Sequence, residues 1–421
     1  MLEDLLVPAY SKFSVGRNDS EAHSPFYADQ IYYQPTQGRP GLRRSMAHFL
    51  RKMLKLPSSA VLCENNLIVE AGCNAVLENL VFCLAEHGDP VLVPTPYYAA
   101  FEFDLVARAG LQIIPVETEL NFNVHGGAAA ESPEYSVSAL VEKAYFPTPA
   151  SLDAAYAASL EQTGRKPRIL LLSHPNNPLG ICYPKEVLSD CISWARENEV
   201  HLISDEIYAG SVYKPSNFHS ALSVAADNPN GAKDMLGIGP YVHFVFALSK
   251  DFASSGLRVG VANTENDSIV LPLQKLNDLC QISSQTQLLV ENMLSGDWAM
   301  SFLEENQSRI RNRSNVLTGT LDELDIPYLE PDSGLFVWMD FRQFLPELDE
   351  NVSQEAQKGP RERALYLELM HEFGLLFTPG LSMRNLEPGF FRCVFTAASD
   401  GEFKLALERL KTFVQSKRDN Q

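Results

Sequence analysis

Lys250 stands at the end of an apolar stretch, residues 242–248, that predicts a buried strand. Arg258 follows Lys250 by eight positions. A lysine in that place is costly unless its charge is neutralised or used. A desolvated lysine can be a free amine that forms a Schiff base with a carbonyl. Arg258 is a permanent cation suited to a phosphate. A ligand with a carbonyl and a phosphate points to pyridoxal phosphate, whereas the alternative is a surface lysine at a strand end.

A second stretch ends an apolar strand on a carboxylate. Residues 200–204 lead into Asp205, and Tyr208 follows three residues later, about one helical turn away. A carboxylate that faces a pyridine nitrogen keeps this nitrogen protonated, so that the ring becomes an electron sink for charge at a substrate Cα. The Tyr208 hydroxyl can then reach the phenolic oxygen of the ring. The alternative is the acidic first turn of an ordinary helix.

Two turns supply further polar groups. In the His-Pro-Asn-Asn-Pro turn at 174–178, Asn177 can donate a hydrogen bond to the same phenolic oxygen, and the bond from Asn177 to Pro178 is a candidate cis peptide. An ordinary turn also fits this composition. At 71–75 a strand passes into a helix, and free backbone N–H groups at a helix start suit a phosphate. Gly72 opens that helix, with Cys73 and Asn74 as the nearest side chains.

Two more positions complete the candidate set. Tyr97 and Tyr98 follow a strand, and one of them can stack on a planar cofactor ring, with core aromatics as the alternative. Arg392 starts an apolar strand, where an unpaired cation is costly. A bidentate pair with the carboxylate of an amino-acid substrate accounts for it, and an internal salt bridge is the alternative.

The elements around these residues alternate between strand and helix. Short apolar strands at 67–69, 91–93, 111–116, 169–172, 200–204 and 242–248 are separated by helical segments, which predicts a mainly parallel α/β sheet covered on both faces. Ligands bind beyond the carboxyl ends of such strands. Helices are expected at 42–55, 72–86, 99–109, 152–162 and 185–198, a loop at 121–138, and a surface excursion at 214–240.

The pattern changes beyond Trp298, where a long helix, a strand at 334–339, a polar stretch at 347–360, a helix at 361–373, a strand pair and a final helix predict a smaller α+β domain. The expected organisation is an N-terminal arm and part of the small domain at 1–40, a large domain at 41–298 and a small C-terminal domain at 299–421.

Bulk properties exclude several classes of protein. The chain has 421 residues, 45% of them hydrophobic, and a formal net charge of -19, which argues against nucleic acid or an anionic membrane as a partner. Its seven cysteines are odd in number and widely spaced, so neither a zinc site nor a disulfide framework is expected. The acidic N-terminus does not read as a secretory signal, and no apolar run approaches a membrane span. A cytoplasmic protein without a metal is the simplest interpretation.

Taken in order, the motifs resemble the class I/II aminotransferases (pyridoxal-phosphate fold type I), and most closely the 1-aminocyclopropane-1-carboxylate synthases and their synthase-like relatives. The resemblance spans roughly residues 31–415. The motifs that carry it are Thr-Pro-Tyr-Tyr at 95–98, Phe-Cys-Leu-Ala at 82–85, Asn-Pro-Leu-Gly at 177–180, Ser-Asp-Glu-Ile-Tyr at 204–208, Ser-Lys-Asp at 249–251, Gly-Leu-Arg-Val-Gly at 256–260, Gly-Leu-Phe-Val-Trp-Met-Asp at 334–340 and Glu-Pro-Gly-Phe-Phe-Arg at 387–392.

The resemblance implies roles for these residues. Lys250 carries the cofactor as an internal aldimine and later exchanges the Cα proton, while Asp205 pairs with the pyridine nitrogen. Asn177 and Tyr208 bind the phenolic oxygen. The remaining implied roles are phosphate binding by Arg258 and binding of the substrate carboxylate by Arg392. Ring stacking is implied for Tyr98, with Tyr97 as the runner-up.

A further implied role concerns a second subunit. Tyr33 resembles the tyrosine that crosses to the phosphate of the partner subunit, which implies a homodimer with shared sites. The chain also departs from the family pattern. Ala247 replaces a phosphate-binding serine, for which Ser249 can compensate. No Met-Gly-Leu-Ala-Glu-Asn-like motif, which supplies a glutamate in true synthases, is found near the N-terminus.

These residues serve more than one reaction. The first interpretation is a synthase-like enzyme that deprotonates an α-amino acid at Cα and then eliminates or cyclises, or cleaves a C–S bond. The second is an aminotransferase that uses the same first steps and releases a 2-oxo acid. A third is a non-catalytic domain that binds the cofactor as a sensor. What separates the first two is recognition of the side chain and the geometry of reprotonation.

Overall fold

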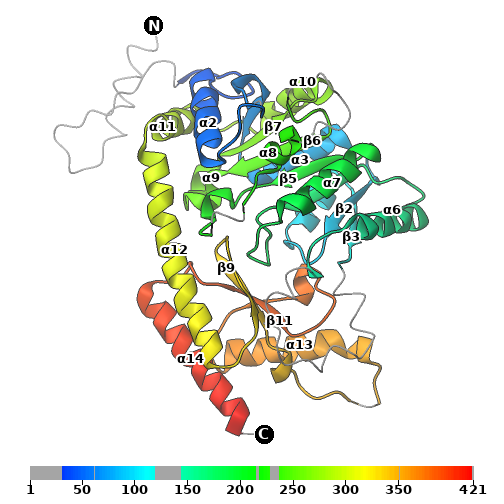
Figure 1. Cartoon of the computed structure of the whole chain (residues 1–421), viewed down its shortest axis with the longest axis vertical. Coiled ribbons are helices and arrows are strands. Elements are labelled where there is room, and N and C mark those ends of the chain that lie inside the picture. The colour runs from blue at the N-terminus through cyan, green and yellow to red at the C-terminus, as the bar shows by residue number, and fades with distance from the viewer. Residues whose placement is uncertain are drawn as a thin grey trace, which may run out of the picture.

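The computed structural model describes residues 31–60, 62–118, 144–214, 218–227, 237–349 and 351–419. Two sheets organise these residues (Figure 1). The larger sheet has seven strands in the order β1-β7-β6-β5-β4-β2-β3. Its strands are β1 (Leu67–Glu70), β2 (Pro90–Pro94), β3 (Gln112–Val116), β4 (Ile169–Ser173), β5 (His201–Asp205), β6 (Val242–Ala247) and β7 (Gly260–Thr264).

Strand direction in the large sheet is mostly parallel, as predicted. β3, β2, β4, β5 and β6 pair in parallel, whereas β7 runs antiparallel to both of its neighbours, β6 and β1. Every residue of β2, β4, β5 and β6 is buried, because helices cover both faces of the sheet. This explains why these strands read as continuous apolar runs rather than as alternating ones.

Helices flank both sheets (Figure 1). They are α2 (Pro40–Met53), α3 (Cys73–Leu84), α6 (Pro149–Thr163), α7 (Lys185–Glu197), α8 (Ala221–Asp227), α9 (Leu248–Asp251), α10 (Asp267–Leu276), α11 (Ser284–Leu294), α12 (Trp298–Glu323), α13 (Gln354–His371) and α14 (Asp400–Asp419). Within the described residues, no helix combines the length and the apolar character that crossing a bilayer demands.

Three sequence predictions need correction. The helix expected over 99–109 is a π-helix of Glu102–Ala107. The excursion expected over 214–240 contains α8, whose first N–H donates to the buried Glu206 carboxylate. The helix expected from 361 begins seven residues earlier, at Gln354, where the Ser353 hydroxyl caps it. In the last two cases the local composition favoured a different answer, because Pro, Gly and polar residues conceal a helix that tertiary contacts stabilise. The loop expected at 121–138 lies outside the described residues.

The smaller sheet has four antiparallel strands in the order β10-β11-β9-β8. They are β8 (Tyr328–Leu329), β9 (Phe336–Asp340), β10 (Thr378–Pro379) and β11 (Phe390–Val394). Phe341 lies at the centre of its core and contacts the rings of Phe391 and Phe413 at 5.7 and 6.2 Å between centroids. The predicted α+β character of this region is confirmed.

The helix α12 joins the two parts of the molecule, since it starts beside α11 and ends beside α14 (Figure 1). Its side chains bind both sides, because Asn306 donates to the Asp251 carbonyl at 3.0 Å and Arg313 donates to the Ala398 carbonyl at 2.7 Å. The predicted boundary between 298 and 299 coincides with the start of this helix; the domain boundaries remain a prediction.

Candidate functional site

A cavity of about 120 Å³ opens at the carboxyl ends of β4, β5 and β6. It brings together residues from segments far apart in the chain, as the sequence predicted. Its lining comprises Cys73, Asn74, Leu77, Tyr98, Phe101, Asp104, Ser173, Asn177, Asp205, Ile207, Tyr208, Ser249, Lys250, Ser255 and Arg258. Of the predicted site residues, only Gly72, Arg392 and Tyr33 are absent from this lining, and the first two adjoin it.

The register of the parallel strands explains why these residues meet. Ser173, the last residue of β4, pairs with Asp205, the last residue of β5, and Asp205 pairs with Val245 near the end of β6. The His174 N–H donates to the Asp205 carbonyl at 2.8 Å, which holds the two strand ends together. Lys250 follows β6 on the short helix α9. The ends of the parallel strands therefore position the polar side chains of the cavity, as expected for an α/β sheet.

Asp205 is a buried carboxylate that forms no ion pair with a described residue. It is 5% exposed, and its Oδ1 accepts hydrogen bonds from the Ile207 N–H at 3.3 Å and the Cys73 thiol at 3.6 Å. Burial raises the pKa of Asp205 to about 7. No ion pair to it is formed by any described residue. A protonated ring nitrogen placed in the cavity would supply the missing positive charge and restore the ionised carboxylate.

Gly72 and Arg258 form a cradle beside the start of α3. The Arg258 guanidinium donates to the Ala71 carbonyl at 3.2 Å and lies so close to Gly72 that a Cβ there would stand 2.4 Å from Nη2. Gly72 also has a φ of +89°, which favours glycine. Behind it begins α3, whose first N–H groups belong to Cys73 and Asn74. A cation beside a free helix N-terminus suits a phosphate.

The structure distinguishes the two neighbouring tyrosines. Tyr98 lines the cavity and meets the ring of Phe101 edge-on at 5.6 Å. Tyr97 is 3% exposed, and its hydroxyl donates instead to Glu102 at 2.8 Å. Only Tyr98 is therefore placed to contact a ring in the cavity. On the opposite segment, Tyr208 meets the ring of Phe336 edge-on at 5.3 Å, and burial raises the pKa of its hydroxyl.

Arg392 reaches the site from the small sheet. Its Nη1 donates to Asn177 Oδ1 at 2.7 Å and its Nη2 to Thr378 Oγ1 at 3.2 Å, while its Nε is buried with no hydrogen-bond partner. The internal salt bridge considered from the sequence is not found, since none of the described carboxylates pairs with it. Burial lowers the pKa of Arg392. A half-buried guanidinium with spare donors is suited to an incoming carboxylate.

Of two further sequence expectations, one is wrong and the other is not tested by a single chain. The prediction of a cis bond between Asn177 and Pro178 is wrong, because the cis peptide bonds of the described residues are Thr95–Pro96 and His174–Pro175. Tyr33 is 99% exposed and lies outside the cavity, next to Tyr32 and the segment 281–285. Its expected contact with a second subunit stays a prediction.

Sequence reasoning missed several lining residues, of which Asp104 is the most polar. Its Oδ1 accepts a hydrogen bond from the Asn74 side chain at 2.6 Å, and burial raises its pKa. Ser255 and Ser173 also line the cavity. A usable signal existed only for Ser255, which lies between the predicted Lys250 and Arg258. Asp104 lies on the π-helix, and the spacing of an ordinary α-helix does not predict which of its side chains face the cavity.

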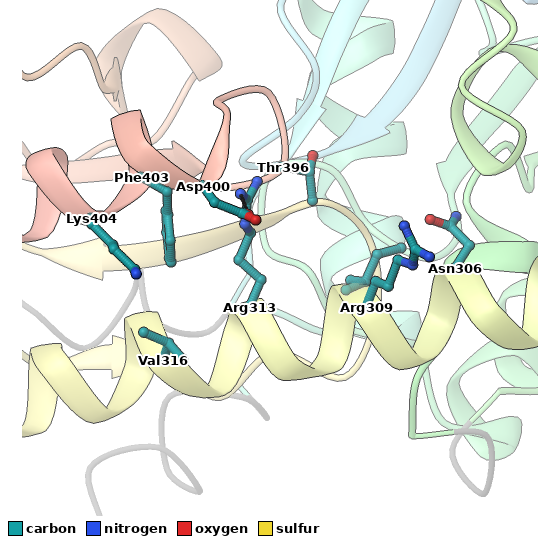
Figure 2. A pocket seen from close by; sticks show the side chains of 9 residues that line it. Asn306, Arg309, Arg313, Val316, Thr396, Asp400, Phe403 and Lys404 are labelled. Atoms are coloured by element: carbon teal, nitrogen blue, oxygen red, sulfur yellow. Dashed lines mark hydrogen bonds and ion pairs between the residues drawn. The ribbon is translucent and has the colours of Figure 1, made fainter.

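A wider groove of about 670 Å³ lies between α12 and the start of α14 and holds none of the predicted residues (Figure 2). Figure 2 shows Arg313 pointing at Asp400, to which it is bound at 2.6 Å. The same guanidinium donates to the Phe395 carbonyl at 3.3 Å and lies 4.8 Å from the Phe403 ring centroid. Arg313 therefore has a structural role, since its contacts attach the start of α14 to α12. No group of described side chains has the composition of a metal site.

Comparisons with known proteins agree with this geometry. The family model described as aminotransferase class I and II matches residues 31–410. The 1-aminocyclopropane-1-carboxylate synthase CMA101 of Cucurbita maxima is 32% identical over 98% of this chain and 79% of its own length. The 1-aminocyclopropane-1-carboxylate synthase 11 of Arabidopsis thaliana is 33% identical over 91% of this chain and 75% of its own length.

Solved structures share the fold. An aspartate aminotransferase double mutant of Thermus thermophilus has a TM-score of 0.70 at 24% identity, covering 92% of this chain and 84% of its own. The aromatic aminotransferase of Pyrococcus horikoshii OT3 has a TM-score of 0.72 at 19% identity, covering 92% and 89%. The predicted fold type I architecture and the resemblance noted from the motifs are both confirmed.

Proposed function

Because this chain belongs to the class I and II aminotransferases, a family of pyridoxal-phosphate-dependent enzymes that includes its 1-aminocyclopropane-1-carboxylate synthase relatives, we propose that its cavity binds pyridoxal phosphate and acts on an α-amino acid. The proposed reaction is of the synthase-like type: deprotonation at Cα followed by elimination or cyclisation, or by cleavage of a C–S bond. The alternative outcome is transamination to a 2-oxo acid, which uses the same groups.

The observation that carries this proposal is the meeting of three groups in one cavity. Lys250 offers an amine, Asp205 a buried carboxylate that forms no ion pair with a described residue, and Arg258 a guanidinium beside the start of α3. Pyridoxal phosphate has an aldehyde, a ring nitrogen and a phosphate that complement these three groups. When bound, it supplies an electron sink that stabilises negative charge at a substrate Cα.

The residues of the cavity then have separate tasks. Asp205 holds a proton on the ring nitrogen, because its burial makes an unpaired negative charge unfavourable. Arg258 and the N-terminal N–H groups of α3 bind the phosphate. Tyr98 provides a ring face, and Ser249 a hydroxyl in place of the serine that the chain lacks at Ala247. Lys250, once its amine is free, takes the proton from Cα and returns it.

The substrate is held from the side of the small sheet. Arg392 binds the α-carboxylate with the donors that its neighbours leave free. Asn177 and Tyr208 donate to the phenolic oxygen of the cofactor and so fix the ring in its plane. With the carboxylate and the ring both fixed, the Cα–H bond can be held toward Lys250, and this alignment raises the rate.

We also propose a cytoplasmic homodimer in which Tyr33 of one subunit completes the phosphate site of the other. The near-complete exposure of Tyr33 supports this, because an aromatic side chain that the other described residues leave uncovered is available to a second copy. Within the described residues all cysteines are free, which supports a reducing compartment.

The first experiment asks whether the chain binds pyridoxal phosphate covalently. The purified protein is mixed with the cofactor, a visible absorption band is recorded, and borohydride reduction followed by peptide mass analysis locates the modified lysine. We expect the band in the wild type and in Lys185→Ala, an exposed lysine paired with Asp227, but not in Lys250→Ala. A wild type without a band, or one modified at another lysine, overturns the proposal.

A second experiment separates the two outcomes of the reaction. The holoenzyme is incubated with a panel of amino acids, some with a leaving group at Cβ or Cγ, including S-adenosylmethionine. Loss of the leaving group without accumulation of the aminated cofactor supports the synthase-like reaction, whether the product is a cyclised amino acid or, after elimination and hydrolysis, a 2-oxo acid with free ammonia. Accumulation of a 2-oxo acid together with the aminated cofactor assigns the chain to transamination instead.

A further inference from the structure

The residue after Lys250 is a buried acid that does not line the cavity. Asp251 is 0% exposed and ends the short helix α9, so its backbone is continuous with that of Lys250. Its carboxylate has no cationic partner among the described residues. Burying an unpaired carboxylate is costly unless hydrogen bonds satisfy it. The hydrogen-bond donors to the Asp251 carboxylate therefore show which contacts offset the cost of burying it.

Both partners of the Asp251 carboxylate lie on the turn that carries Tyr208. Oδ1 accepts from the Ser211 hydroxyl at 2.6 Å, and Oδ2 accepts from the Gly210 N–H at 2.7 Å. The contact requires glycine, because a Cβ on Gly210 would lie 2.6 Å from Oδ2. Tyr208 directly precedes the turn Ala209–Ser211. One carboxylate thus joins the segment of Lys250 to the segment of Tyr208.

The same two segments are fixed again by adjacent side chains of α12. Asn306 donates to the Asp251 carbonyl at 3.0 Å, and Gln307 donates to the Gly210 carbonyl at 3.0 Å. The Ser211 carbonyl in turn accepts from the Gly334 N–H at 3.1 Å, just before β9 of the small sheet. The contact between Asp251 and the Tyr208 turn is therefore the centre of a junction between the large sheet, α12 and the small sheet.

We propose that Asp251 is a positioning residue, which sets the place of the Lys250 amine relative to the Tyr208 hydroxyl by holding Gly210 and Ser211. The inference rests on the proposed function, because it concerns how readily Lys250 joins the cofactor. A misplaced amine attacks an aldehyde more slowly, since reacting groups must be held in a productive geometry. A role limited to stability would leave the rate of attachment unchanged in a protein that has folded.

The test measures the attachment of pyridoxal phosphate to Lys250 in the apoprotein, by borohydride trapping at set times and peptide mass analysis. Asp251→Ala removes both hydrogen bonds, and Ser211→Ala removes one with little change in packing. We expect the rate to fall by about tenfold or more in Asp251→Ala and by a smaller factor in Ser211→Ala. Asp251→Asn keeps the shape and one acceptor oxygen, so it should recover part of the rate.

Glu362→Gln is the matched control. Glu362 is a buried carboxylate in α13 that also accepts two backbone N–H bonds, from Leu381 at 2.9 Å and Gly389 at 2.8 Å, but it contacts neither Lys250 nor Tyr208. Its variant should attach the cofactor at the wild-type rate. Cofactor attachment that is slowed equally in Glu362→Gln, or that keeps the wild-type rate in both Ser211→Ala and Asp251→Ala, overturns the positioning role of Asp251 but not the proposed function. A wild type that never attaches the cofactor overturns the proposed function as well.

Discussion

The Arg392 guanidinium donates from Nη1 to Asn177 Oδ1 at 2.7 Å, and this hydrogen bond connects β11 of the small sheet to the turn that follows β4 of the large one. Because Oδ1 is occupied, the amide nitrogen of Asn177 is the end that is left to donate elsewhere. The group that we expect to bind the substrate carboxylate therefore also orients a group that we expect to bind the cofactor.

Arg392→Lys should weaken substrate binding far more than cofactor binding. A lysine cannot form the two parallel hydrogen bonds that a guanidinium makes with a carboxylate. We expect KM to rise by about 10- to 100-fold, measured by steady-state kinetics with whichever amino acid the panel identifies. Arg342→Lys is the control, since Arg342 is already paired with Asp340 at 2.6 Å, and its KM should stay near the wild-type value. An unchanged KM in Arg392→Lys contradicts the assigned role.

Asp205→Asn should bind the cofactor and yet lose most of its activity. A neutral amide cannot hold a proton on the ring nitrogen, so charge at Cα is no longer stabilised. We expect kcat to fall at least about 100-fold, with the visible band still present. Glu206→Gln changes the neighbouring, equally buried carboxylate, whose Oε1 caps α8, and should retain activity within a few-fold. Comparable losses in both variants would assign the effect to general damage.

The stability of the apoprotein should fall as pH rises from 6.5 to 8.5. Burial raises the pKa of Asp205 and Asp251 to about 7 and that of Glu70 and Glu206 to about 8. The folded state thus holds protons that the unfolded state has released, so this stabilisation is lost as pH rises through the folded pKa values. Three buried histidines with lowered pKa values, His174, His201 and His243, act in the opposite direction only below about pH 6.5.

Thermal unfolding of the apoprotein at several pH values checks this trend. Asp205→Asn should reduce its slope, because the amide does not titrate. Adding pyridoxal phosphate should also reduce the slope, since a protonated ring nitrogen pairs with the ionised carboxylate. A melting temperature that is constant or rises between pH 6.5 and 8.5 would show that these carboxylates do not have the raised pKa values.

Gly72→Ala should lower the affinity for pyridoxal phosphate. The new Cβ would stand 2.4 Å from Arg258 Nη2, and the φ of +89° is unfavourable for alanine. The guanidinium has to move away from the helix start, which separates the two groups expected to bind phosphate. We expect a dissociation constant about tenfold higher, measured by titrating the apoprotein. Gly164→Ala, at a helix end with a φ of +70° and open space around it, controls for backbone strain and should bind normally.

Mixing two inactive variants should restore activity if the active sites are shared. Lys250→Ala lacks the reactive amine, and Tyr33→Ala lacks the side chain that we expect to reach the other subunit. In a mixed dimer one of the two sites receives both native residues, so activity should reappear after the subunits exchange. Activity that stays absent while mixed dimers form, as shown by mass spectrometry of the intact assembly, contradicts the shared site.

Much of the fold could be read from the sequence for one physical reason. Strands buried on both faces, such as β4 and β5, need continuous apolar residues, and these runs stand out between helices. The segments that were misread, α8 and the start of α13, are stabilised by groups elsewhere or hidden by polar composition. Local propensity is weak against such contacts.

The sequence by itself determined which chemical groups the site has. Asp205 ends one parallel strand and the segment with Lys250 and Arg258 follows the neighbouring parallel strand, so the topology brings all three to one edge of the sheet. Only the tertiary structure decided how they are supported. The bond from Arg392 to Asn177 spans 215 residues, and the bond from Ser211 to Asp251 spans 40. Such pairs leave no periodic signal in the chain, since their spacing depends on how whole elements pack rather than on the repeat of a helix or a strand.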